Sequence, residues 1–278
     1  MKVGYAILYE DGTLTISKKH TILQNPIYKD YGEFDDMNIP WKNDYAEIKI
    51  VKIIGQVKSN NMNSWFENCY NLSTLIDFEN LDVSDCKDFS YVFHGCELLT
   101  EVFALKNWNV VNGKIFECMF THCYLLKDIS ALSNWNVSNG EDFSLMFCEC
   151  GLTDLSALIN WDVSKGRNFF AMFRCCESLT DISSIQNWNV SNGEDFTEMF
   201  MYCNLKSVFI DTWTISNKKT YMNFTNMFAC NESLKNIYIP NSFEQISVFI
   251  FLGCNENLKI HWKDKIYTYQ DLLEYGTF

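Results

Sequence analysis

Apolar residues recur in register along most of the chain, and this repeat dominates its hydrophobic and polar pattern. Phenylalanines separated by 27, 27, 27, 26, 27, 28 and 23 residues form one column: Phe66, Phe93, Phe120, Phe147, Phe173, Phe200, Phe228 and Phe251. Three residues after each of them lies a cysteine or, once, an asparagine: Cys69, Cys96, Cys123, Cys150, Cys176, Cys203, Asn231 and Cys254. Units of this size cannot close a core alone, so the pattern predicts that they stack on one another.

Each unit is predicted to contain one short helix, which comes before the cysteine. Phe143, Met146 and Phe147 have the spacing i, i+3, i+4 that places residues on one face of a helix. Ser138 followed by Glu141 three residues later fits a capping box at its start.

Each unit is also predicted to contain one strand, which comes after the cysteine. Apolar residues there recur at a spacing of three, as in Leu126, Ile129 and Leu132, and a Trp-Asn-Val turn follows. One strand and one short helix per unit fit the range of about 20–29 residues for leucine-rich repeats.

These motifs resemble a known family. Phe-x-x-Met-Phe-x-x-Cys-x-x-Leu-x-x-Ile followed by Asn-Trp-Asn-Val-Ser is similar to the BspA-type leucine-rich repeats, most closely the DUF285 group of bacterial surface proteins and mobile elements. The resemblance covers about residues 62–260 and includes a Tyr5–Ser17 segment at the front. It implies a right-handed solenoid that binds other macromolecules, and it brings no catalytic residues. We therefore expect an α/β fold, a leucine-rich-repeat-like right-handed solenoid of about eight repeats.

The two ends do not follow the repeat, and we expect them to be caps. Residues 1–61 are predicted to form an N-terminal cap, with a β-hairpin of Val3–Tyr9 and Thr13–Lys18 across Asp11-Gly12 and a first strand at Ile48–Val57. Pro26 and Pro40 are expected to bracket a loop.

The other end is predicted to hold a small hairpin and a helical turn. Leu258–Trp262 and Lys265–Thr268 form the expected hairpin, and Tyr269–Tyr275 the turn, which Gly276 ends. The predicted domains are thus 1–61 (N-terminal cap), 62–260 (repeats) and 261–278 (C-terminal cap).

Composition narrows the function classes. The chain has 278 residues, of which 47% are hydrophobic, and this excludes general disorder. Its net charge of -13 argues against direct binding to nucleic acid or to an anionic membrane. The longest apolar run, Val248–Leu252, is too short to cross a bilayer, and the first residues lack the pattern of a secretory signal. We expect a cytoplasmic protein, with a surface or virion location as the alternative.

The sequence offers no catalytic constellation. Its glycines are too widely spaced for a phosphate-binding loop or a nucleophile elbow, and no Cys-x-x-Cys occurs. His94 and His122 lie in neighbouring units and could approach each other, but variable turn positions are the simpler interpretation. We expect no enzyme activity, no cofactor and no metal site.

The 12 cysteines fall into two groups. At the repeated position, the family resemblance implies a small buried side chain that packs against or bonds to turn backbone. We expect free thiols there, in agreement with a reducing compartment, and disulfides between adjacent units are the alternative. The cysteines off this column are expected to be partly exposed: Cys86, Cys118, Cys148, Cys175 and Cys230.

The outward positions of the predicted strands form a candidate partner-binding face. An acidic stripe runs beside a serine stripe, with aromatic residues toward both ends: Glu101, Asp128, Asp154, Asp181; Ser130, Ser156, Ser183; Phe103, Phe209 and Tyr238. Because like charges in register repel one another, stability alone does not favour the stripe, and a protein with a basic surface would gain from it. A merely solvated face, copied with the repeat, is the alternative.

A column of tryptophans follows the same repeat: Trp108, Trp135, Trp161, Trp188 and Trp213. It could stack sugars or bases, but we expect each indole to pack against the next along a flank of the solenoid.

Together these features predict a non-catalytic module that binds a protein through its acidic face. Two alternatives remain: a phage- or mobile-element-encoded inhibitor of a basic nucleic-acid enzyme, and a surface or phage-tail adhesin for a host protein or glycan.

Overall fold

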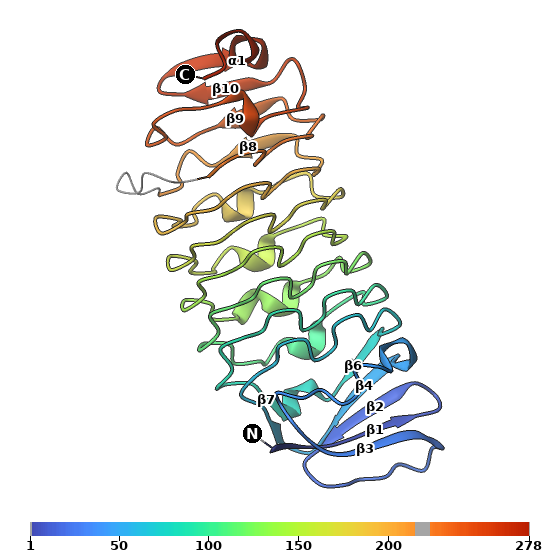
Figure 1. Ribbon diagram of the computed structural model, residues 1–278. Helices are drawn as coiled ribbons and strands as arrows, with labels where there is room; N and C mark the ends of the chain where they lie inside the picture. The colour runs from blue at the N-terminus through green and yellow to red at the C-terminus, as the bar shows by residue number, and fades with distance from the viewer. Residues whose placement is uncertain (1, 215–222, 278) are drawn as a thin grey trace.

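The computed structural model describes residues 2–214 and 223–277, which are wound into a stack of similar coils (Figure 1). A sheet closes the N-terminal end of the stack, and a second sheet with one α-helix closes the other end (Figure 1). The strands are β1 (Lys2–Tyr9), β2 (Thr13–Ser17), β3 (Ile27–Asp35), β4 (Ile50–Ile54), β5 (Val57–Lys58), β6 (Thr74–Ile76), β7 (Leu81–Asp82), β8 (Ser207–Phe209), β9 (Asn236–Tyr238), β10 (Lys259–Trp262) and β11 (Lys265–Thr268). The helix α1 spans Tyr269–Tyr275. Short 3₁₀ helices span Tyr45–Glu47, Phe78–Asn80, Phe103–Leu105, Ser130–Asn134, Ser156–Leu158, Ser183–Ile185 and Val248–Ile250.

The N-terminal sheet has the order β3-β1-β2-β4-β6 and joins the cap to the repeats. The predicted hairpin is confirmed, because β1 and β2 pair antiparallel with Tyr5 opposite Ser17. Strand β4 pairs parallel with β2 on one side and with β6 of the first coil on the other. The sheet therefore continues from the cap into the stack.

The expected loop between Pro26 and Pro40 is wrong for most of its length. Strand β3 lies there and pairs antiparallel with β1 at the edge of the sheet. Its first residues, Ile27–Asp30, are all exposed. An edge strand with so little burial lacks the alternation of apolar residues that identifies a strand in a sequence.

The predicted helix before each cysteine is also wrong. The N–H groups of Phe143, Leu145 and Phe147 donate to carbonyls of the next coil, at N–O distances of 2.8–2.9 Å. Met146, between two of them, closes a turn instead, because its N–H donates to the Phe143 carbonyl at 3.3 Å. Leu145 and Glu149 adopt left-handed conformations, with φ of 57° and 59°. An α-helix needs these N–H groups for its own carbonyls, so bonding between coils replaces the helix while the same apolar face stays buried.

The predicted strands form only toward the two ends of the stack. In the middle coils, 3₁₀ helices occupy these positions, for example Ser156–Leu158 and Ser183–Ile185 (Figure 1). An apolar spacing of three matches the three residues per turn of a 3₁₀ helix, and Leu158 N–H donates to the Leu155 carbonyl at 2.9 Å. The spacing of three was therefore the signal of a 3₁₀ turn rather than of a strand.

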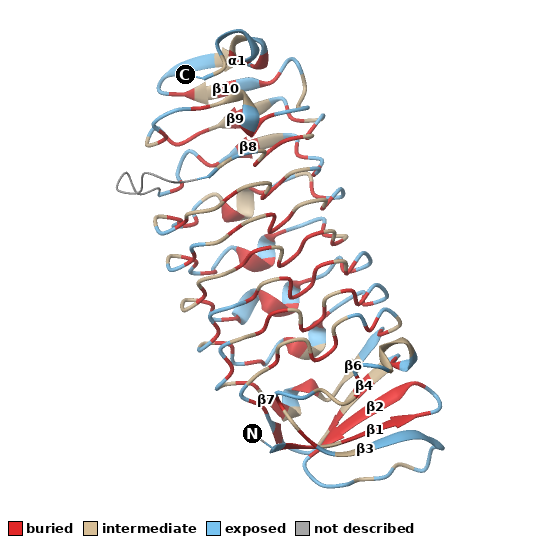
Figure 2. Cartoon of the chain, in the orientation of Figure 1, coloured by how far each residue is buried: buried red, intermediate tan, exposed pale blue. Residues whose placement is uncertain are grey.

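The core is a set of aromatic ladders that run along the inside of the stack. The predicted phenylalanine column stacks ring on ring, with centroid distances from 5.4 to 6.3 Å. A second ladder holds Phe89, Phe116, Phe143, Phe169, Phe196 and Phe224. Buried residues alternate with exposed ones along each coil (Figure 2). Each coil therefore buries its apolar residues against its neighbours, as stacked repeats require.

The cysteine column bonds each coil to the one before it. Cys150 Sγ donates to the Phe120 carbonyl at 3.1 Å, and Cys176 Sγ to the Phe147 carbonyl at 3.2 Å. Burial raises the pKa of both thiols well above its usual value, so they stay protonated donors. All 12 cysteines are free. The expected exposure of the cysteines off the column is wrong for three of them, Cys86, Cys118 and Cys148, which are buried.

The C-terminal sheet has the order β11-β10-β9-β8. Both predicted features of this end are present, because β10 and β11 pair as an antiparallel hairpin and α1 ends at Gly276, where φ is 78°. Within the described ranges, no helix is long and apolar enough to cross a membrane.

Candidate partner-binding face

The candidate face is carried by the 3₁₀ helices of the middle coils and by strands β8 and β9. Glu101 and Asp128 form a parallel bridge between neighbouring coils, and the 3₁₀ helices that follow Asp128, Asp154 and Asp181 pack in sequence on one another. At the C-terminal end, Phe209 lies opposite Tyr238 in a parallel register. The structure therefore aligns the predicted residues along the stack.

Every predicted residue of this face reaches the surface. The four acidic residues are exposed, as are Phe103, Ser130, Ser156 and Phe209. Ser183 and Tyr238 are half-buried. Phe103 is the most exposed hydrophobic residue of this face, with an exposed fraction of 65%, and Lys106 Nζ lies 5.5 Å from its ring centroid.

The acidic stripe has a structural task that the sequence did not reveal. Asp128 Oδ1 accepts a hydrogen bond from Ser130 N–H at 2.8 Å, and the equivalent bonds of Asp154 and Asp181 measure 2.9 and 3.0 Å. The backbone bond from Ser130 is the main reason that the pKa of Asp128 is lowered. Each carboxylate thus accepts from an N–H at the start of a 3₁₀ turn. These bonds give the stripe a local role in the turns, which the expectation from charge repulsion did not include.

Replacing one of these carboxylates tests this role. We expect Asp154→Ala to lower the free energy of unfolding by about 1 kcal/mol, because the N–H of Ser156 loses its acceptor. Asp154→Asn keeps an oxygen at the same place and should change stability by less than about 0.5 kcal/mol. Urea denaturation monitored by tryptophan fluorescence measures both, and equal losses in the two variants would contradict the role.

The face ends in an aromatic stack that is longer than predicted. Phe209 and Tyr238 stack at a centroid distance of 4.9 Å, and His261 of β10 continues the stack at 4.1 Å from Tyr238. His261 was not predicted for this face, because its place in the sequence puts it in the C-terminal cap. The β10 hairpin, which continues the sheet in register, was the signal that could have found it.

Three exposed lysines lie in the coils of this aromatic end: Lys206, Lys235 and Lys259. Lys235 N–H donates to the Lys206 carbonyl at 3.0 Å, whereas Lys259 lies opposite Asn236 in the parallel register.

The tryptophan column does not form a stacking platform. The five indoles are buried, with exposed fractions of 2–4%. Each Nε1–H donates to a carbonyl of the preceding coil, as Trp135 does to Leu105 at 3.1 Å and Trp188 to Leu158 at 3.1 Å. The predicted packing of one indole on the next is seen for Trp108 and Trp135, whose centroids lie 6.3 Å apart. Further along the column the indoles lie against phenylalanines, as Trp188 does against Phe169 at 6.4 Å.

The two histidines of neighbouring coils do approach each other. The rings of His94 and His122 lie 5.2 Å apart between centroids, and burial together with the nearby His122 lowers the pKa of His94. Within residues 2–214 and 223–277, no group of three or more His, Cys, Asp or Glu side chains could hold a metal ion.

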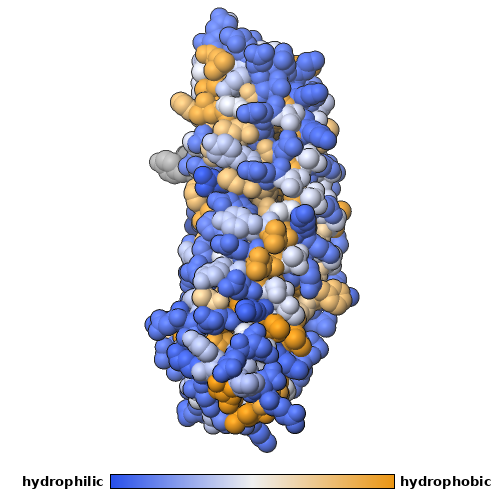
Figure 3. Space-filling model, turned by 90° about the vertical axis from the view of Figure 1, so that its right-hand side faces the viewer, coloured by the Kyte–Doolittle hydropathy of each residue, from blue (hydrophilic) through white to orange (hydrophobic). Residues whose placement is uncertain are grey.

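The rest of the visible surface is mixed. Figure 3 shows one flank of the stack, where small groups of hydrophobic residues are separated by hydrophilic ones.

Comparison with known proteins places the repeats in a family. Residues 54–157 and 126–239 match the family model described as "Mycoplasma protein of unknown function, DUF285". None of the curated proteins matches the chain. The crystal structure of a leucine rich cell surface protein from Faecalibacterium prausnitzii A2-165 has 15% sequence identity and a TM-score of 0.35, over 95% of this chain and 95% of that one. The two family matches together span more than half of the 278 residues, so the chain belongs to the DUF285 family, as its resemblance to BspA-type leucine-rich repeats predicted.

Proposed function

We propose that the chain is a non-catalytic repeat module that binds a protein through the acidic stripe of Glu101, Asp128, Asp154 and Asp181. The observation that carries the proposal is the alignment of these exposed carboxylates on successive coils. A right-handed solenoid of about eight repeats is part of the same proposal, and the phenylalanine ladder supports it.

The partner's surface should be basic where it meets the stripe. The local hydrogen bonds of each Asp come from neutral groups, such as the N–H and hydroxyl of Ser156 for Asp154. No positive charge of these groups therefore offsets the carboxylates of the stripe. Complementary charge speeds association and selects partners more than it adds affinity. With a net charge of -13, the whole chain adds long-range attraction toward such a surface.

The test removes the charges while keeping the hydrogen-bond acceptors. The variant carries Asp128→Asn, Asp154→Asn and Asp181→Asn. The control carries Glu97→Gln, Asp162→Asn and Glu256→Gln, which remove three exposed carboxylates elsewhere; Asp162 also accepts from a backbone N–H, that of Ser164 at 3.0 Å.

Tagged wild type, variant and control are each used to capture proteins from a lysate, which are then identified by mass spectrometry. We expect basic proteins that bind the wild type and the control but not the variant, and binding of a purified partner that is about tenfold weaker for the variant. Equal capture by variant and wild type would refute the proposed face.

A further inference from the structure

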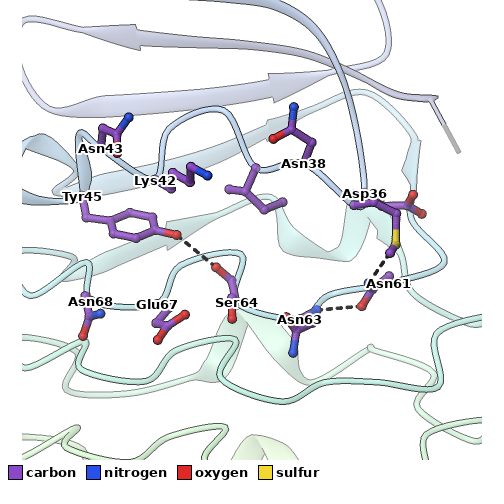
Figure 4. A pocket seen from close by; sticks show the side chains of 12 residues that line it. Asp36, Asn38, Lys42, Asn43, Tyr45, Asn61, Asn63, Ser64, Glu67 and Asn68 are labelled. Carbon is purple, nitrogen blue, oxygen red and sulfur yellow. Dashed lines mark hydrogen bonds between the residues drawn. The ribbon is translucent and has the colours of Figure 1, made fainter.

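A hollow of about 460 Å³ lies outside the candidate face, where the N-terminal cap meets the first coil (Figure 4). Residues 36–45 and 61–68 line it. The side chains of Asn38 and Asn43 are exposed, and their amides point away from the first coil. The polar groups of this hollow therefore do not converge on one ligand.

A more reactive feature recurs in three coils, in the turn that follows the tryptophan. There an asparagine directly precedes a glycine: Asn112-Gly113, Asn139-Gly140 and Asn192-Gly193. In an unfolded chain this dipeptide is labile, because glycine has no side chain to hinder the approach of its nitrogen to the asparagine amide.

The reaction of such a pair is deamidation by water. The glycine nitrogen loses its proton to solvent, its electron pair forms a bond to the asparagine Cγ, and the Cγ–Nδ2 bond breaks to release ammonia. Water then opens the five-membered imide, which leaves aspartate or its β-linked isomer. The net change consumes an amide and water and produces a carboxylate and ammonium, so water is the only reagent.

In the folded stack, the glycine nitrogen is held in a turn. Each of the three glycine N–H groups donates to the carbonyl of the valine three residues earlier, at 2.8, 2.7 and 2.8 Å in chain order. All three glycines are buried. The proton that must leave before the ring can close is therefore bonded to a carbonyl and shielded from hydroxide.

The asparagine amides are held by the neighbouring coil. Each Nδ2 donates to a carbonyl of the preceding coil at 2.7–2.8 Å: Asn112 to Ser84, Asn139 to Val111 and Asn192 to Ser164. Ring closure moves Cγ onto the glycine nitrogen, and this movement breaks the bond to the preceding coil. Stacking thus restrains both reacting groups.

Packing explains why the glycine is kept. A Cβ added to Gly140 would lie 2.3 Å from Cζ of Phe143, and one added to Gly193 would lie 2.2 Å from Cζ of Phe196. Both rings belong to the second phenylalanine ladder of the core. Because only glycine leaves room for the ring, every coil with asparagine in the preceding position contains the labile pair.

We propose that Asn112, Asn139 and Asn192 are deamidation sites that the stack keeps closed, so that each reacts only when its coil opens. The product weakens the coil in which it forms. Aspartate lacks the Nδ2 donor, and its carboxylate faces the carbonyl that the amide bonded. Deamidation would therefore make a transient opening irreversible, whatever partner the protein binds.

The test incubates the intact chain at mildly alkaline pH in the native state and in denaturing guanidinium chloride. Peptide mass spectrometry measures the conversion of each asparagine over time. We expect the three sites to react at least about thirtyfold more slowly in the native state, because only the open fraction of each coil reacts. Guanidinium below the unfolding transition should speed the native reaction, since it favours opening.

The chain offers a matched control site. Asn136 is exposed and is followed by valine, whose side chain hinders ring closure. It should convert much more slowly than Asn139 in the denatured chain, three residues away in the same coil. This comparison connects the reaction to the glycine.

Two variants test the consequence for stability. Asn139→Asp is the reaction product and should lower the guanidinium midpoint, because the Val111 carbonyl loses its donor. Asn139→Lys introduces the residue that Lys165 supplies in the next coil, and it should unfold close to the wild-type midpoint while it removes one site.

Three results would overturn the proposal. The first is native conversion as fast as that of the denatured chain, which would show that stacking does not close the sites. The second is conversion of none of the three asparagines in denaturant. The third is an Asn139→Asp variant as stable as the wild type, which would contradict the expected effect of the product.

Discussion

Phe147→Ala should lower the free energy of unfolding by about 3–5 kcal/mol, the cost of removing a buried aromatic ring from a packed core. Phe147 is fully buried, and its ring stacks on Phe120 and Phe173 at centroid distances of 5.6 and 5.7 Å. Because Phe147 has a ring on each side, its removal leaves a cavity that can close only if two coils move. Chemical denaturation followed by circular dichroism measures the loss.

The matched control is Phe103→Ala. Phe103 is the same residue type with 65% of its surface exposed, so its removal should change stability by less than about 0.5 kcal/mol. If the two variants lose similar stability, the ladder is not what holds adjacent coils together.

Asn231→Ala should lower the free energy of unfolding by about 3 kcal/mol, because it leaves several buried polar groups without partners. Asn231 is fully buried, and its Nδ2 donates to the carbonyls of Phe200 at 2.8 Å and Phe228 at 2.9 Å. Its Oδ1 accepts from Leu205 N–H at 3.1 Å. The side chain therefore makes hydrogen bonds to two consecutive coils.

The cysteine column supplies a sharper comparison. Asn231→Cys introduces the residue that the other coils have at this position. In the next coil, for example, Cys254 Sγ donates to the Phe228 carbonyl at 3.0 Å. A thiol can replace the donor but not the acceptor of Leu205, so we expect about half of the loss seen with alanine. The exposed Asn160→Ala is the control, measured by the same urea denaturation, with an expected change below about 0.5 kcal/mol. Equal losses for Asn231→Ala and Asn231→Cys would refute this role for the amide's donor.

The candidate face was predicted residue by residue, yet the sequence could not show how it is built. The outward positions of Asp128, Asp154 and Asp181 followed from the period, because each aspartate directly precedes the central apolar residue of its unit, which is buried. That each carboxylate accepts from a backbone N–H two residues later depends on the turn conformation. His261 joined the aromatic end through a strand pairing between the last coil and the cap.

The hollow where the cap meets the first coil could not be predicted at all. Its lining comes from a loop that follows an edge strand and from the first coil, two segments that neither repeat nor share a motif. Only the packing of the cap on the stack brings Asn43 and Glu67 to the same hollow.

The sequence by itself determined the repeat, its register and the identity of the buried columns. Phenylalanine, tryptophan and cysteine recur at fixed spacing, and burial of apolar side chains depends on that spacing whatever the backbone does. Only the tertiary structure decided the local conformation of each coil. The N–H groups of residues such as Phe143 and Leu145 bond to the next coil, and this competition between neighbouring coils and local helix formation is settled only when the coils stack.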